Sequence, residues 1–177
     1  HTDGAIRAAT AKLDAQHAPQ DIQAALASLA GVEKLHGVAD EGSAVFAARC
    51  ATCHRVRGVG ESVGPDLAGV HDWDTARLLT SIVHPNAEIN PQYTAYSIDT
   101  VDGRSLSGIL EAETATSITL RMSGGEQTVL KTQVRSAEPL DISLMPEGLL
   151  DGLAPQNVAD LIAFIRGDAR NARLPIL

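Results

Sequence analysis

Apolar residues recur at helical spacing in the first part of the chain and again near its end. Ile6, Ala9 and Leu13 share one face of a first expected helix, and Pro19 suits the first turn of a second. Further helices are expected over residues 41–50, 75–84 and 155–166. The pattern therefore predicts two helices ahead of a region that is helical at both of its ends.

The pattern changes to strand-like alternation between residues 93 and 137. Asp102-Gly103 and Gly124-Gly125 are turn sequences that join antiparallel neighbours. Strands are expected over residues 93–101, 106–111, 117–122 and 127–131, with a short fifth over 134–137. The predicted fold class is mainly α: a helical fold with an inserted small antiparallel β-sheet and an N-terminal helical pair.

These elements divide the chain into three parts. Residues 1–36 are expected to form an N-terminal helical extension or linker. Residues 37–170 form the main domain, with the β insertion at about 91–137, and residues 171–177 form a C-terminal tail. The chain starts with His1 rather than Met and shows no signal peptide, so we interpret it as a processed product or a fragment of a longer protein.

Composition adds one unusual feature to this picture. The chain has 177 residues, of which 44% are hydrophobic but only 3% are aromatic. Aromatic side chains normally supply much of the bulk of a core, so we expect a thin helical core or a large group of another kind within it. The net charge of −8 argues against binding to nucleic acid or to an anionic membrane surface. No apolar run approaches the roughly 18 residues of a membrane span.

Both cysteines of the chain lie in one motif, Cys50-Ala51-Thr52-Cys53-His54. This is the attachment sequence for c-type heme. The two thiols bond to two vinyl groups on one porphyrin edge, so they must project about one helical turn apart. His54 then reaches the iron from the same side. The motif predicts one covalent heme c per chain.

Two other readings of a CxxC pair have less support. A thioredoxin-like redox dithiol follows a strand and opens a helix, whereas Cys50 follows an expected helix and leads into a Gly-rich loop. A structural zinc site needs about two further ligands, and the remaining histidines are scattered along the chain.

A low-spin heme iron needs a sixth ligand, and in cytochromes c this is often Met, which raises the reduction potential. Met145 precedes Pro146 in a loop shortly before the last expected helix, and we favour it. Met122 ends an expected strand and is a weaker candidate. The remaining alternatives are His36, His71 and His84.

Three residues after the motif are candidates for holding the heme and its ligand. A ligating histidine usually donates its second ring N–H to a carbonyl or carboxylate, and the backbone carbonyl of Pro65 is the expected acceptor. Leu67 is a candidate wall of the heme crevice. The indole N–H of Trp73 is a candidate donor to a heme propionate.

The ordered set of these motifs resembles a known family. The run from Phe46 to Val56 is similar to the opening of a class I cytochrome c fold. More narrowly, the chain resembles the cytochrome c-like heme-binding domain of the planctomycete and verrucomicrobial type. The matching elements are residues 63–67, 81–86, Tyr93, 102–104, 107–108, 143–149 and 159–165. The resemblance covers about residues 40–167 and carries the heme role onto Cys50, Cys53, His54 and Met145.

This resemblance implies a mono-heme c-type cytochrome domain that transfers one electron at a time and is not itself an enzyme. Phe46 and Phe164 are expected to pack where the first and last helices of the domain meet. A redox partner protein or dehydrogenase domain, on the same native chain or another, would supply electrons. The location would be periplasmic or otherwise outside the cytoplasmic membrane. The alternative is a heme-based sensor or small-ligand-binding domain with a labile distal Met.

Overall fold

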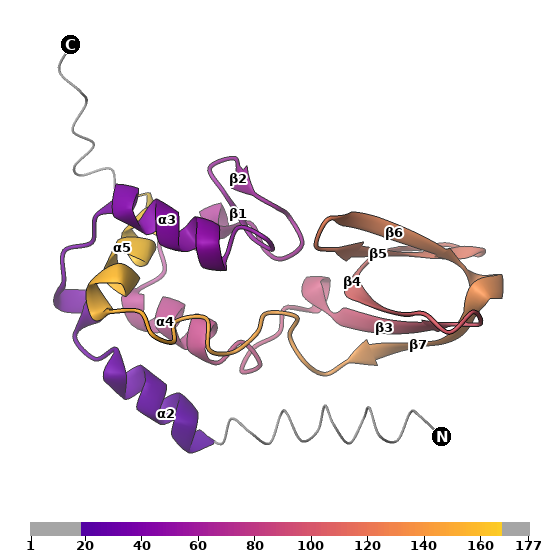
Figure 1. Ribbon diagram of the computed structural model, residues 1–177, viewed down its shortest axis with the longest axis horizontal. Coiled ribbons are helices and arrows are strands. Elements are labelled where there is room, and N and C mark those ends of the chain that lie inside the picture. The colour runs from indigo at the N-terminus through magenta and orange to yellow at the C-terminus, as the bar shows by residue number, and fades with distance from the viewer. Residues whose placement is uncertain (1–18, 168–177) are drawn as a thin grey trace, which may run out of the picture.

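The computed structural model describes residues 19–167, which form a helical part at one end and a β-sheet at the other (Figure 1). The helical part contains α2 (Pro19–Ser28), α3 (Ala39–Arg49), α4 (Thr75–Val83) and α5 (Pro155–Arg166). A long connection returns from the sheet to α5 (Figure 1). The helix expected around residues 6–13 and the tail at 171–177 lie outside the described residues.

Helices α3 and α5 cross closely, and this crossing is the centre of the helical part. The rings of Phe46 and Phe164 lie with their centroids 5.2 Å apart, which confirms the predicted contact between the two helices. Gly42 allows the approach, because a Cβ atom there would overlap the backbone carbonyl of Asp160. The buried Asp160 side chain accepts a hydrogen bond of 2.8 Å from the N–H of Val38, immediately before α3.

The core of the helical part is built from aliphatic side chains. Phe46 is the one aromatic residue fully buried among the described residues. Around it are packed Leu29, Val32, Val56, Leu78, Leu79, Leu150, Val158, Leu161, Ile162 and Ile165. The few aromatic residues therefore leave a core made of smaller side chains from all four helices and the loops between them.

The sheet contains β3 (Ala95–Thr100), β4 (Ser105–Glu113), β5 (Ser117–Met122), β6 (Gly125–Leu130) and β7 (Val134–Leu140). All neighbours are antiparallel, in the order β6-β5-β4-β3-β7. Ile98, Ile118 and Leu120 form an apolar cluster of the sheet's own. Tyr93, expected within the first strand, lies instead in a short 3-10 helix before it.

The prediction of a mainly α fold is wrong, and the fold is mixed α and β. The five strands span six, nine, six, six and seven residues, against ten, eleven, nine and twelve in the four helices. The strands are close to their expected positions, but β4 and β7 are longer than the alternation suggested. The sheet lies between α4 and α5 in the chain and has an apolar cluster of its own.

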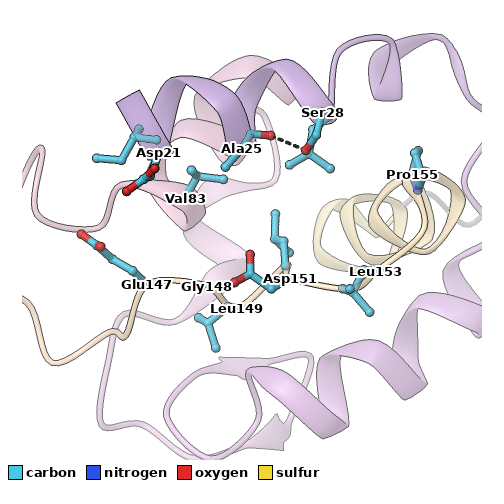
Figure 2. A pocket seen from close by; sticks show the side chains of 14 residues that line it. Asp21, Ala25, Ser28, Val83, Glu147, Gly148, Leu149, Asp151, Leu153 and Pro155 are labelled. Carbon is cyan, nitrogen blue, oxygen red and sulfur yellow. Dashed lines mark hydrogen bonds between the residues drawn. The ribbon is translucent and has the colours of Figure 1, made fainter. Parts of the chain in front are cut away.

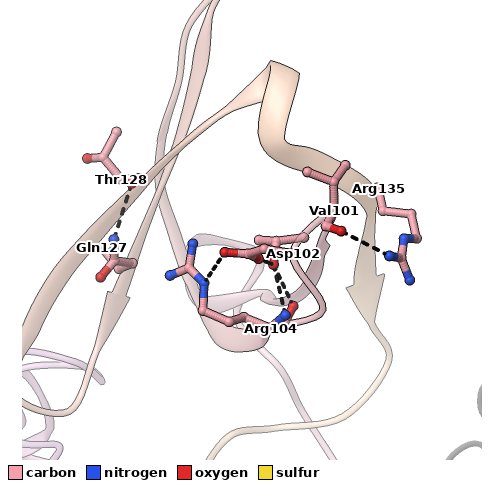
Figure 3. A network of polar contacts seen from close by, with 7 residues as sticks. Val101, Asp102, Arg104, Gln127, Thr128 and Arg135 are labelled. Atoms are coloured by element: carbon pink, nitrogen blue, oxygen red, sulfur yellow. Dashed lines mark hydrogen bonds and ion pairs between the residues drawn. The ribbon is translucent and has the colours of Figure 1, made fainter.

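The β3–β4 turn is closed by the hydroxyl of Thr100, which is fully buried (Figure 3 shows the surrounding network). The hydroxyl accepts a hydrogen bond of 3.0 Å from the N–H of Arg104 and also contacts the carboxylate of Asp102. Arg104 Nε donates to the same carboxylate at 2.9 Å. These contacts hold the pKa of Asp102 below its ordinary value. The hydrogen bond with Thr100 has the largest effect, and the one with Arg104 has the second largest.

Replacing Thr100 with valine is expected to raise the pKa of Asp102 and to destabilise the protein by about 1–2 kcal/mol, since the backbone N–H and carbonyl of Arg104 lose their part-buried partner. Because folding lowers the pKa of Asp102, the stability that this carboxylate contributes is lost as the pH falls through its folded pKa. The free energy of unfolding of the valine variant should therefore fall less in this pH range. NMR titration measures the pKa of Asp102, and urea unfolding at several pH values measures the free energy of unfolding. Thr100→Ser keeps the hydroxyl and should keep the low pKa; equal pKa values in the two variants would contradict the assignment.

Candidate functional site

Cys50 caps the C-terminal end of α3, and the chain then turns tightly so that His54 follows within one loop. The N–H groups of Cys53 and His54 both donate to the carbonyl of Cys50, at 3.1 and 2.8 Å. Both cysteines are free thiols and are half-buried. The turn therefore keeps the two thiols and the imidazole together on one short segment.

The electrostatics of the two cysteines differ from those of a redox dithiol. Burial, only partly opposed by Arg49, raises the pKa of Cys50 to about 11. Burial also raises the pKa of Cys53, and the nearby Glu61 acts in the same direction. Reactive cysteines of thioredoxin type have a lowered pKa, so this pair lacks the thiolate character that such chemistry needs.

The His54 ring is held in one orientation. Its Nδ1 lies 2.8 Å from the carbonyl oxygen of Pro65. Because a carbonyl only accepts, Nδ1 carries the proton and Nε2 is left with a free lone pair. Burial lowers the pKa of His54, while the bond to Pro65 acts in the opposite direction. The ring is therefore neutral at neutral pH, which is the form that binds a metal.

Two glycines form a cradle around His54. A Cβ atom on Gly64 would lie 2.8 Å from Cε1 and 3.1 Å from Nδ1 of the ring. Gly60 has φ +93°, and a Cβ there would overlap the backbone carbonyl of His54. Gly60 ends a two-strand hairpin of β1 (Arg55–Val56) and β2 (Val59–Gly60), which lies in the region expected to be a Gly-rich loop. The thiols, the oriented imidazole and the glycine cradle together fit a covalently attached heme.

The loop that contains Met145 returns to the neighbourhood of the cysteine motif through an apolar cluster. Val63, Ala95 and Ile109 form its buried part. Cys53 and Leu144, the residue before Met145, both pack against it. The cluster thus joins the loop of the cysteine motif to the loop that contains Met145. The sheet supplies Ala95 and Ile109 as the surface on which both loops pack.

A comparison with known protein families matches the part of the chain that carries the cysteine motif. Residues 39–113 match the family model described as Cytochrome c. The chain contains a cytochrome c-like domain. Members of this family bear covalently bound heme c and serve as electron carriers, and Cys50-Ala51-Thr52-Cys53-His54 fits their attachment motif. The narrower planctomycete type stays a prediction.

The other comparisons add little. No curated protein matches the chain. A solved structure titled "1.55 A Crystal structure of the pleiotropic translational regulator, Hfq" is similar over 37% of this chain and 89% of that chain, with 12% sequence identity and a TM-score of 0.26. That likeness is too weak to carry an argument. Among the described residues, no helix is long and apolar enough to cross a membrane.

The remaining predicted site residues of the cytochrome c domain lie in different surroundings. Leu67 begins a 3-10 helix and packs against the helical core. Trp73 also packs there; its carbonyl accepts from Arg166 at 2.6 Å and its ring lies 3.7 Å from the guanidinium carbon of Arg77. Their contacts with heme, like the ligand roles of His54 and Met145, stay predictions.

Three of the four rival ligands, namely Met122, His36 and His71, are placed less favourably. Met122 packs against the apolar cluster inside the sheet. His36 and His71 are exposed, and His71 Nδ1 lies 2.9 Å from the carbonyl oxygen of Ala68. Within residues 19–167, no group of three or more His, Cys, Asp or Glu side chains is arranged to hold a metal ion.

Sequence reasoning missed two residues that connect the parts of the site. Arg121 of β5 donates to the carbonyl of Ser62 at 2.7 Å and so links the sheet to the loop around His54. Asn86 contacts the Met145 loop on both sides. Asn86 was part of the matching run 81–86, but its side-chain role depends on loops that only the folded chain brings together.

Proposed function

We propose that this domain is a mono-heme c-type cytochrome that transfers single electrons between redox proteins. Cys50 and Cys53 would hold heme c through thioether bonds, and His54 and Met145 would ligate its iron from opposite faces. The family supports the heme and the carrier role. The individual residues are proposed from the motif, the cradle of His54 and the position of the Met145 loop.

One observation supports the ligand pair above the others. Cys53 and Leu144 pack against the same buried cluster around Val63. Cys53 precedes His54, and Leu144 precedes Met145. Since Met122 packs within the sheet instead, Met145 is the methionine whose neighbour shares a cluster with the attachment motif.

The chain's own residues prepare the site for electron transfer. The Pro65 carbonyl keeps a proton on Nδ1 of His54, which leaves Nε2 free to bind metal. The absence of a side chain at Gly64 leaves room for the ring, because a Cβ atom there would lie 2.8 Å from its Cε1. Heme c, when bound, supplies an iron that cycles between Fe(II) and Fe(III). A pre-oriented imidazole and a thioether need little rearrangement when the charge on the site changes.

The partner would be a redox protein or a dehydrogenase domain. The net charge of −8 favours a partner with a positively charged docking face, because complementary charge accelerates association. Heme attachment takes place outside the cytoplasmic membrane, so a periplasmic or similar location is proposed.

The test is the absorption spectrum of the oxidised heme protein. The weak long-wavelength band of Met–Fe(III) ligation is expected in the parent and should disappear in Met145→Ala. Met122→Ala, a substitution of the other methionine, should keep it. A parent without the band, or a band that survives Met145→Ala, would refute the ligand pair. Rapid CO binding to the reduced parent would favour the sensor alternative.

A further inference from the structure

The side chain of Asn86 spans the short segment that contains Met145. Its Oδ1 accepts a hydrogen bond of 2.8 Å from the N–H of Ser143, two residues before Met145. Its Nδ2 donates to Oε1 of Glu147, two residues after Met145, at 3.2 Å. The Ser143 hydroxyl in turn accepts from the N–H of Met145 itself at 3.1 Å. One amide therefore restrains both ends of a five-residue segment.

The backbone around Asn86 is held in place by a proline and by hydrogen bonds. It follows the buried Pro85, whose ring limits the backbone, at the end of α4. The N–H of His84 donates to the carbonyl of Thr80, and the N–H of Ala87 donates to that of His84, both at 2.8–3.0 Å. The amide thus projects from a turn that is tied to a helix.

The chain that leaves the Met145 segment at Glu147 has open space on one side. A cavity of about 580 Å³ lies between α2, the end of α4 and the stretch from Glu147 to Pro155 (Figure 2). Glu147 and Leu149 line one side of it, and Asp21 and Ala25 of α2 line the other (Figure 2). The chain that follows Met145 therefore borders open space and has room to move.

We propose that Asn86 is a positioning residue that holds the Met145 segment closed, so that the thioether stays in place as an iron ligand. The proposal rests on the proposed function of Met145. Asn86 does not touch the iron; it acts through Ser143 and Glu147. Its loss should increase the fraction of molecules in which the segment opens and an outside ligand can take the place of Met145.

Imidazole binding to the oxidised heme protein measures this opening. Asn86→Ala is expected to bind imidazole about tenfold more tightly than the parent, equal to about 1.4 kcal/mol, and to show a weaker long-wavelength band. Asn86→Asp keeps an acceptor for Ser143 but sets a carboxylate against that of Glu147, so it should also bind imidazole more tightly than the parent. Asn90→Ala is the matched control, because Asn90 makes a comparable bond to the N–H of Gln92 but none to the Met145 segment.

A double substitution separates positioning from a general loss of structure. In Met145→Ala the segment has no ligand to hold, so adding Asn86→Ala should not change imidazole affinity further. An equal increase in both backgrounds, or an affinity in Asn86→Ala equal to that of the parent, would overturn the proposal while leaving Met145 ligation intact. A parent without the Met–Fe(III) band would overturn both.

Discussion

Replacing Gly42 with alanine is expected to destabilise the protein by about 3 kcal/mol or more, the upper end of the range for overpacking. Helix propensity alone predicts the opposite, since alanine is favoured over glycine in a helix interior by about 1 kcal/mol. The new Cβ would overlap the backbone carbonyl of Asp160 and lie 2.9 Å from the nitrogen of Leu161. Backbone atoms of a buried helix cannot turn aside, so α3 and α5 would have to separate.

Denaturant unfolding, followed by far-UV circular dichroism, measures this loss. The matched control is Gly69→Ala, because a Cβ there meets no heavy atom within 4 Å and Gly69 has no positive φ. The control should change the free energy of unfolding by less than about 0.5 kcal/mol. A Gly42→Ala protein as stable as the parent would show that the helices do not cross as closely as described.

Replacing Gly64 with alanine is expected to disturb the iron site more than the fold. The new Cβ would lie 2.8 Å from Cε1, 3.1 Å from Nδ1 and 3.3 Å from Nε2 of His54. The ring can yield only by turning away from the carbonyl of Pro65, which it contacts at 2.8 Å. Loss of such outer support typically weakens metal ligation about 10–100-fold.

The heme should stay covalently attached, because Cys50 and Cys53 remain in place. Its high-spin fraction should be larger than in the parent, because ligation by His54 is weaker. Electron paramagnetic resonance and absorption spectra of the oxidised protein measure that fraction, and denaturant titration of the Soret band measures how readily His54 dissociates. Gly69→Ala again serves as the control. Spectra and titration identical to those of the parent would contradict the cradle assigned to Gly64.

Much of the local structure could be predicted from the sequence because its causes are local. Pro19 begins α2 as expected, and Asp74 caps α4 through a bond of 2.7 Å to the N–H of Arg77. Asp40 lies in the first turn of α3 and does not cap it. The N–H of Val38 is bound instead by Asp160, which is 122 residues away, and no local pattern contains that information.

The sequence by itself determined the chemistry of the attachment motif and the positions of most helices and strands. Adjacent thiols and an imidazole, apolar periods of helix and strand, and glycine turns are properties of short segments. Tertiary structure alone decided that the sheet has an apolar cluster of its own, and that Gly42 and Gly64 each face atoms which leave no room for a side chain. It also decided that Asn86 spans the Met145 segment. Each of these depends on atoms far apart in the chain, whose distances are set by packing and not by sequence spacing.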